Sequence, residues 1–220
     1  MEIPKNWTFK NTSVAKGFDS HVREQLPWYD LATNMVSHIA RHYLPENGVM
    51  YDIGASTGNI GNSLKNTLSD RKIKFIAIEQ SEEMAQIYNG PDNLIIADAL
   101  SFEFEKFDVA VIFLVAMFMP TSKRRLFLER LKEKINSGGI IIIFDKINYF
   151  DGYLSTVMHR LTMSEKIASG ASSEDVFNKE MSLSGIQRPL PKYFIKSISP
   201  TAVEVFRFGE FCGWIIKNDE

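Results

Sequence analysis

The feature that most constrains the fold of this chain is an alternation between short apolar runs and stretches with helical spacing. Runs of strand length occupy residues 49–53, 74–79, 93–97, 108–113 and 140–145. Parallel neighbours in a sheet need long crossovers, whereas antiparallel neighbours can be joined by a short turn. The alternation therefore predicts an α/β domain whose parallel sheet is covered by helices on both faces.

The helices between these strands are expected from their caps and their periodicity. Residues 59–68 and 81–88 are expected to form two of them, the second capped by Ser81. A third, basic helix is expected to begin after Thr121 or Ser122. Charged helix faces are usually solvated, so its basic residues predict no particular partner.

The N-terminal region differs from this pattern. Residues up to 28 look irregular and rich in aromatic side chains, so we expect a cap over residues 1–29. Asp30 is then expected to cap a helix that carries Leu31, Met35 and Ile39 on one apolar face.

The C-terminal third also breaks the alternation. Runs at 202–207 and 211–217 are too close for a crossover, so they predict an antiparallel hairpin that completes a seven-stranded sheet. Before them, residues 152–191 are a candidate substrate lid within a single domain spanning 1–220. Its first half shows helical spacing of the apolar residues Tyr153, Val157 and Leu161. Its second half, 169–191, looks like a loop.

Composition narrows the class of protein. The 220 residues include 45% apolar and 24% charged side chains, and no apolar run approaches the length of a membrane span. The single cysteine, Cys212, cannot form an internal disulfide, and the first ten residues lack the apolar core of a signal peptide. We therefore expect a cytoplasmic protein. The net charge of −2 makes nucleic acid unlikely as a direct substrate.

Residues suited to a nucleoside ligand follow the first three strands. Residues 52–58 read Asp-Ile-Gly-Ala-Ser-Thr-Gly and open a helix, so their glycines allow the backbone to approach a ligand. Glu79 ends the second strand and can accept hydrogen bonds from both ribose hydroxyls. Asp98-Ala99 ends the third, where an acid can accept from an adenine amino group. Ligands of open α/β sheets bind at these strand ends, so the three features together predict an adenosine-type cofactor.

The spacing of the turn favours S-adenosylmethionine over a nicotinamide dinucleotide. The dinucleotide fingerprint needs glycines where this chain has Ser56 and Asn59. Asp52 would repel a pyrophosphate but suits the ammonium and sulfonium of S-adenosylmethionine. We predict that the following residues bind this cofactor: Tyr29, Asp52, Gly54, Ala55, Ser56, Gly58, Asn59, Glu79, Gln80, Met84, Asp98, Ala99 and Phe113.

These motifs resemble those of the Rossmann-like class I S-adenosylmethionine-dependent methyltransferases. Within that superfamily, the chain is similar to the carboxy-S-adenosylmethionine synthase family of tRNA wobble-uridine modification. The similarity rests on residues 18–22 and 27–29, the serine-centred turn, Asp145-Lys146 and residues 206–209. It implies that Tyr29 lies beside the cofactor.

One departure from that family concerns the lid. The resemblance implies a lid arginine that binds the extra carboxylate, yet this region reads Asn178-Lys179-Glu180, with Arg188 offset. We expect residues 169–191 to be mobile without ligand and to close over the cofactor and the acceptor, with Lys179 or Arg188 meeting an anionic group.

Catalytic and metal-binding residues are less clearly marked. Tyr29, His21, His159 and Lys146 are weak candidates for a general base. The histidines show no metal-ligand spacing, so no metal is expected. The apolar residues 113–120 either form a wall around the methyl group or belong to the core.

The leading interpretation is a methyltransferase acting on a small-molecule acceptor. A carboxy-S-adenosylmethionine synthase-like enzyme and a non-catalytic S-adenosylmethionine-binding protein are the alternatives. A homodimer is compatible with the sequence.

Overall fold

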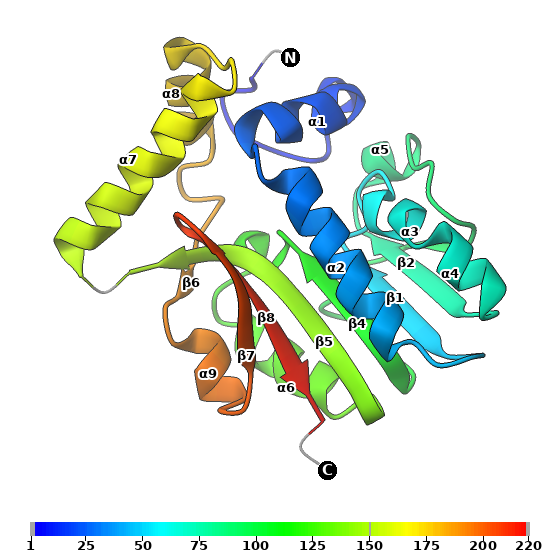
Figure 1. Cartoon of the computed structure of the whole chain (residues 1–220). Helices are drawn as coiled ribbons and strands as arrows, with labels where there is room; N and C mark the ends of the chain where they lie inside the picture. Colours follow the sequence, from blue (N-terminus) through cyan, green and yellow to red (C-terminus); the bar gives the residue numbers. More distant parts are fainter. Residues whose placement is uncertain (1–2, 150, 219–220) are drawn as a thin grey trace.

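The sheet of this computed structural model, which describes residues 3–149 and 151–218, confirms the predicted α/β architecture (Figure 1). Residues 1–2 of the expected cap therefore lie outside the described residues, as do 150 and 219–220 of the expected single domain. The strands of the main sheet are β1 (Val49–Ile53), β2 (Lys74–Glu79), β3 (Leu94–Ile96), β4 (Phe107–Phe113), β5 (Ile135–Asn148), β7 (Val203–Phe208) and β8 (Phe211–Lys217).

The strand order is β3-β2-β1-β4-β5-β8-β7, with parallel pairing from β3 to β5 and antiparallel pairing of β8 with β5 and β7. The predicted seven-stranded path and terminal hairpin are thus present. An additional two-residue strand, β6 (Leu190–Pro191), pairs with the end of β5 at Ile147 and Asn148.

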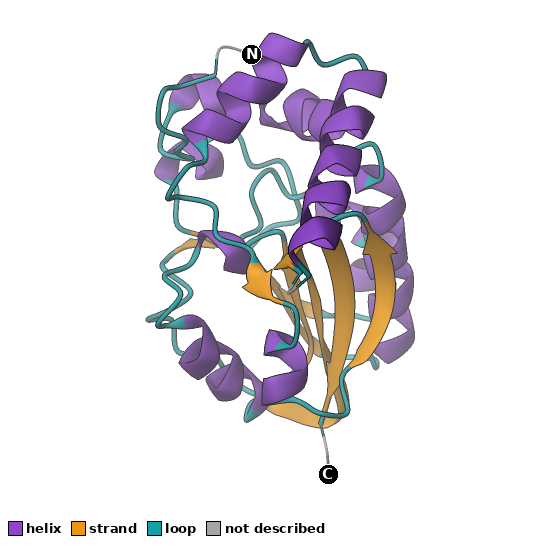
Figure 2. Cartoon of the chain, turned by 90° about the vertical axis from the view of Figure 1, so that its left-hand side faces the viewer, coloured by secondary structure: helices purple, strands orange, loops and turns teal. Residues whose placement is uncertain are grey.

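Helices cover both faces of the sheet (Figures 1 and 2). They are α1 (Thr12–Gln25), α2 (Tyr29–Tyr43), α3 (Asn59–Ser63), α4 (Lys65–Asp70), α5 (Glu82–Ala85), η1 (Ala116–Phe118), α6 (Arg124–Lys132), α7 (Gly152–Ala168), α8 (Ser173–Ser182) and α9 (Phe194–Ile198). None of the helices in the described ranges is long and apolar enough to cross a membrane.

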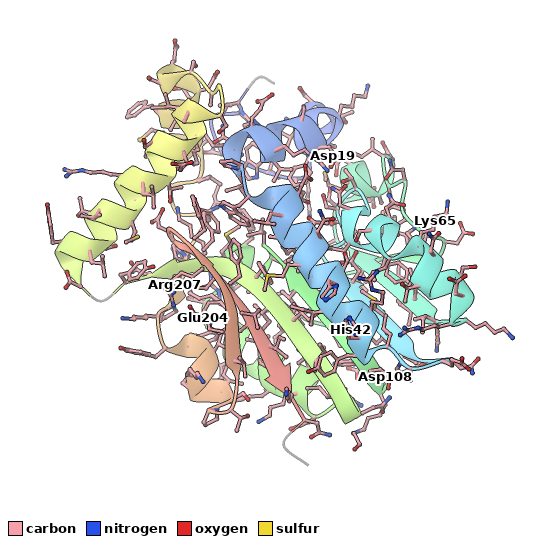
Figure 3. The ribbon with its side chains drawn as sticks, in the orientation of Figure 1. Asp19, His42, Lys65, Asp108, Glu204 and Arg207 are labelled. Atoms are coloured by element: carbon pink, nitrogen blue, oxygen red, sulfur yellow. The ribbon has the colours of Figure 1, made fainter. Side chains whose placement is uncertain are left out.

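The alternation of side chains along the strands divides the core into two halves. Tyr51 and Ile53 of β1 belong to the half that packs against α6 and α9, whereas Met50 belongs to the half that packs against α2, α3 and α4. At the edge where the strands begin, Asp108 (Figure 3) accepts hydrogen bonds from the Val49 amide at 2.7 Å and from the Asn136 side chain at 3.0 Å.

The N-terminal region is more ordered than the sequence predicted. Residues 12–25 form α1, whose first turn is capped by the Asn11 side chain, which accepts from the Ser13 and Val14 amides. The expectation of an irregular segment was therefore wrong. The buried face of α2 was also misjudged, because Ala32 and Val36 are fully buried while Leu31 is 66% exposed.

Two further helix predictions needed correction. The predicted helix 59–68 is divided at Leu64 into α3 and α4. In the candidate lid, residues 173–182 form α8 instead of a loop, because Ser172 caps the helix by accepting from the Asp175 amide at 3.0 Å. Figure 1 shows that α7, α8 and α1 lie beyond the carboxyl ends of the parallel strands.

Candidate functional site

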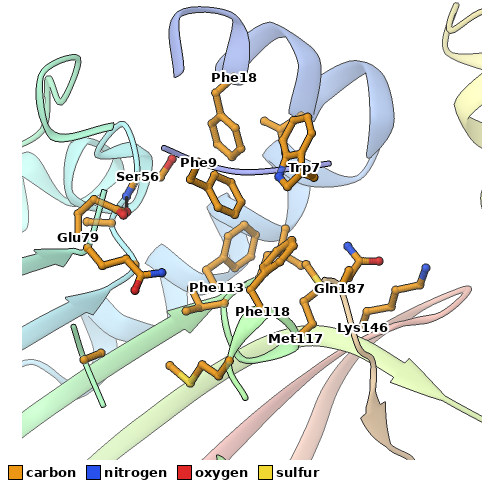
Figure 4. A pocket seen from close by; sticks show the side chains of 18 of the residues that line it. Trp7, Phe9, Phe18, Ser56, Glu79, Phe113, Met117, Phe118, Lys146 and Gln187 are labelled. Atoms are coloured by element: carbon orange, nitrogen blue, oxygen red, sulfur yellow. Dashed lines mark hydrogen bonds between the residues drawn. The ribbon is translucent and has the colours of Figure 1, made fainter. Parts of the chain in front are cut away.

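A cavity of about 390 Å³ lies between the carboxyl ends of the strands and the cover formed by the N-terminal segment, α1, α7 and α8. Figure 4 shows Ser56 and Glu79 at one end and Lys146 and Gln187 at the other. Aromatic side chains lie between these ends, namely Trp7, Phe9, Phe18, Phe113 and Phe118. The cavity thus has a polar end at the first strands, an apolar middle and a second polar end beneath the lid helices.

The glycine turn after β1 requires unusual backbone conformations. Gly54 has a φ of 74°, and the amides of Gly54 and Ala55 both donate to the Ile78 carbonyl, at 2.8 and 3.0 Å. Gly58 has a φ of 91°, and a Cβ there would lie 2.6 Å from the backbone nitrogen of Gly90. Glycine is therefore needed at 58 for both conformation and space.

Glu79 links this turn to the second strand. Its side chain accepts from the Ser56 amide through Oε2 and from the Ser81 amide through Oε1, both at 2.9 Å. It is only 7% exposed, and burial raises the pKa of its carboxyl above the usual value. Each carboxylate oxygen can accept a second hydrogen bond, so the residue can still bind a ligand in the cavity.

Asp52 has an incomplete set of partners. The side chain is 2% exposed, and its Oδ2 is buried without a hydrogen bond. Burial, followed by the nearby Glu79 charge, raises the pKa of Asp52 to about 7. The hydroxyl of Ser56 is also buried without a partner. Buried polar atoms normally have partners, and these two line the cavity, so they fit a cationic, hydrogen-bonding ligand.

Tyr29 joins the turn to α1 through a network of side chains. Asn59 donates to the Tyr29 hydroxyl at 3.3 Å and to Asp19 at 2.9 Å, and Asp19 also accepts from Thr57 at 2.6 Å. The Tyr29 ring packs edge-on against Phe113 with centroids 5.4 Å apart. Burial raises the pKa of Tyr29 to about 12, so its hydroxyl stays protonated at neutral pH.

The acidic residue after β3 lies at the rim of the cavity. Asp98 is exposed, and its carboxylate accepts from the Leu100 amide at 2.9 Å. Ala99 and Gln80 line the cavity beside it. After β4, the apolar residues 113–115 and 117–120 line the cavity.

The end beneath the lid contains three buried lysines. Lys146 lies 3.5 Å from Glu210, and Lys166 lies 2.8 Å from Glu180. Lys179 has its amine over the ring of Trp7. Each lysine is at most 7% exposed, and all three line the cavity.

Several predicted residues do not line the cavity. Gly58 and Met84 are not among the lining residues, and Met84 is fully buried. His159 is partly exposed and lies 3.3 Å from Glu210, outside the cavity lining. Arg188 is exposed, and its backbone amide donates to the Met117 carbonyl at 2.8 Å. The other predicted cofactor residues, together with Tyr29, His21 and Lys146 as candidate bases, do line it.

The sequence did not reveal Trp7, Phe9 and Lys166 as lining residues. Trp7 and Phe9 lie in a segment without periodicity, and its backbone is held by Trp7 N donating to the Ser182 carbonyl at 2.9 Å. Lys166 lies on α7, which the sequence predicts from the spacing of its apolar residues, and that spacing does not indicate which polar residues are buried. These residues are far apart in the sequence and meet only in the folded chain, so no sequence motif contains them.

The sequence matches a known domain family and is similar to the sequences of named enzymes. Residues 51–143 match the family described as a methyltransferase domain. The carboxy-S-adenosyl-L-methionine synthase of Staphylococcus epidermidis is 29% identical over 192 residues, covering 85% of this chain and 84% of that protein. The protein of the same name from Pectobacterium atrosepticum is 24% identical and covers 82% and 76%.

Structural comparisons agree on the fold. An S-adenosylmethionine-dependent methyltransferase from Clostridium acetobutylicum superposes with a TM-score of 0.58 at 13% identity, covering 92% of this chain and 98% of its own. The plantazolicin methyltransferase BpumL, solved with S-adenosylhomocysteine, has a TM-score of 0.58 at 15% identity and covers 94% and 89%. The arrangement of strands and helices is therefore shared with proteins that bind this nucleoside.

Proposed function

Because the chain belongs to the class I S-adenosylmethionine-dependent methyltransferase superfamily, we propose that it transfers a methyl group to a small-molecule acceptor. S-adenosylmethionine is the cofactor, and when bound it supplies a methyl group on a sulfonium leaving group. The acceptor would bind at the lysine-lined end of the cavity.

We assign the cofactor to the end formed by the turn and the first strands. The Glu79 carboxylate, already oriented by two backbone amides at 2.9 Å, would accept from the ribose hydroxyls. The unpaired Oδ2 of Asp52 would face the cationic methionine portion. Tyr29, Asn59 and Phe113 would surround the remainder, with Asp98 and Ala99 near the adenine.

The observation that carries the proposal is a single cavity with two polar ends. Its volume of about 390 Å³ lies within the range of small-molecule sites, and the lid helices cover the end that the cofactor residues leave free. The apolar wall at residues 113–120 would exclude water. Holding donor and acceptor together would then supply most of the rate enhancement.

The cover over this cavity comes from two segments. We propose that the cap within residues 1–29 and the lid at 152–191 act together, because the Trp7 amide bonds to the end of α8 at 2.9 Å. Both segments would belong to one domain with the sheet. The packing of α8 makes any opening a movement of a helix instead of a loop.

The named relatives favour a second candidate, a carboxy-S-adenosylmethionine synthase-like enzyme. A bound carboxylate needs a cation such as the lid arginine of that family, but no arginine of the described residues lines the cavity, and Lys146 and Lys166 already pair with Glu210 and Glu180. We therefore rank methyl transfer first. A role in tRNA modification would follow only from the second candidate.

Incubation with methyl-¹³C-labelled S-adenosylmethionine and a protein-free extract of the cells that express this chain tests the proposal. We expect S-adenosylhomocysteine to form together with a labelled small molecule, and Asp52→Ala protein to form neither. A carboxylated cofactor formed from prephenate, without methylated product, would favour the second candidate. Binding without any turnover would make the protein a non-catalytic binder.

A further inference from the structure

Among the three buried lysines that line the cavity, Lys146, Lys166 and Lys179, only Lys179 has no acidic partner in the described chain. Lys146 pairs with Glu210 and Lys166 pairs with Glu180. No carboxylate of the described chain lies within ion-pair distance of Lys179, whose amine instead lies over the Trp7 ring. The side chain is 7% exposed and lines the cavity where we place the acceptor.

The charged and titratable groups that face Lys179 come from three helices. They are His21 of α1, Lys166 of α7 and Glu180 of α8 itself. Burial, and then the charge of Lys166, lower the pKa of Lys179 to about 5, and the attraction of Glu180 does not offset them. At neutral pH the amine is therefore uncharged and carries a free lone pair.

We propose that Lys179 is the general base that removes a proton from the acceptor during methyl transfer. The inference rests on the proposed function and narrows its substrate class to acceptors whose nucleophilic atom bears both a lone pair and a proton: a hydroxyl, a thiol or a primary or secondary amine. A tertiary amine or a carbanion would have no use for such a base.

A lone pair of the acceptor atom forms the bond to the methyl carbon, and the carbon–sulfur bond breaks with its electron pair left on sulfur. The acceptor's proton passes to the Lys179 Nζ lone pair, and the electrons of its former bond stay on the acceptor atom. The ring of Trp7 then stabilises the new ammonium by cation–π attraction.

Other groups in the cavity are less suited to this role. The pKa of Tyr29 is raised to about 12 by burial, so its hydroxyl holds its proton. Burial, followed by the charge of Lys179, lowers the pKa of His21 to about 4, which makes it a weaker base than an ordinary imidazole. Lys146 and Lys166 are occupied by Glu210 and Glu180.

The first test needs no acceptor. In protein labelled with ¹³C-lysine, the ¹³Cε signal absent from Lys179→Gln protein identifies Lys179, and its shift is followed from about pH 4.5 to about pH 11. We expect its midpoint near pH 5. A midpoint near the ordinary lysine value of about 10.4 would overturn the proposal.

The second test measures turnover with the extract defined above. Lys179→Gln should lower kcat by about 10² to 10⁴, the usual contribution of a general base. Its KM for S-adenosylmethionine should change by less than about threefold. Lys179→Arg should be as inactive, because a guanidinium is always charged and cannot take a proton. Lys16→Gln, which removes an exposed lysine from α1, is the matched control.

The outcomes separate the inference from the proposed function. Activity of Lys179→Arg protein would mean that residue 179 binds an anion. Normal transfer by Lys179→Gln protein would mean that the residue takes no part in the chemistry. Either result overturns the general-base role of Lys179 and leaves the proposed methyl transfer standing. No transfer by the unaltered protein overturns the proposed function together with the base.

Discussion

Replacing Glu79 with alanine removes the residue on which the proposed cofactor site most depends. Its two carboxylate oxygens hold the amides of Ser56 and Ser81 at 2.9 Å, which orients the group towards the cavity before any ligand binds. Glu79→Ala should therefore change both the affinity for the cofactor and the stability of the turn.

The structure sets the size of both effects. Hydrogen bonds to a charged group contribute about 1.5–3 kcal/mol each. Part of this loss is offset, because the variant has no carboxylate whose burial under the ligand would cost free energy. We expect a net loss of about 2–3 kcal/mol, or about 30- to 150-fold in Kd. The Ser81 amide is fully buried and would lose its acceptor, which should lower the free energy of unfolding by about 1–3 kcal/mol.

Calorimetric titration with S-adenosylmethionine, paired with urea unfolding, measures the two effects separately. Glu82→Ala serves as a matched control, because that carboxylate is exposed on α5 and does not line the cavity. It should bind the cofactor as the unaltered protein does. A folded Glu79→Ala protein whose Kd changes by less than about threefold would refute the assignment.

Three further predictions concern charge, backbone and mobility. S-adenosylmethionine should bind more tightly as pH rises through about 7, because the cation needs ionised Asp52, and Asp52→Asn should abolish this dependence in calorimetry. The free energy of unfolding of the ligand-free protein should fall as pH rises from about 4 through about 7, because the raised pKa of Asp52 means that folding favours its protonated form. Gly58→Ala should lower the free energy of unfolding by about 3 kcal/mol, from its φ of 91° and the 2.6 Å contact of a Cβ. The control Gly185→Ala, with a φ of 75° and open space, should cost about 1 kcal/mol in the same urea titration. Amides within residues 169–191 should exchange more slowly once S-adenosylhomocysteine and acceptor extract are added, and slow exchange unaffected by ligand would make this stretch a fixed structural element.

The sheet could be predicted from the sequence because its strands are apolar runs with clear boundaries. β1 and β2 begin and end at the predicted residues, since Pro45 to Gly48 precede the first and Ser81 follows the second. These strands then fix where the turn and Glu79 lie. The end of the cavity that the turn and Glu79 form therefore follows from local sequence.

The lid end could not be predicted in the same way. The α8 helix has few apolar positions, and two of them, Phe177 and Met181, are 65% and 59% exposed, so amphipathic spacing gave no signal. Its cap, Ser172 with Asp175 three residues on, was the visible clue. The environment of Lys179 depends on contacts between three distant segments, which no spacing in the sequence records.

The central claim is that the turn after β1 and Glu79 bind S-adenosylmethionine in this cavity. A crystal structure of the protein with S-adenosylhomocysteine tests it most directly. We predict both ribose hydroxyls within hydrogen-bond distance of the Glu79 carboxylate, with the methionine portion beside Asp52. Ligand density elsewhere on the molecule, or a ribose bound without contact to Glu79, would contradict the account.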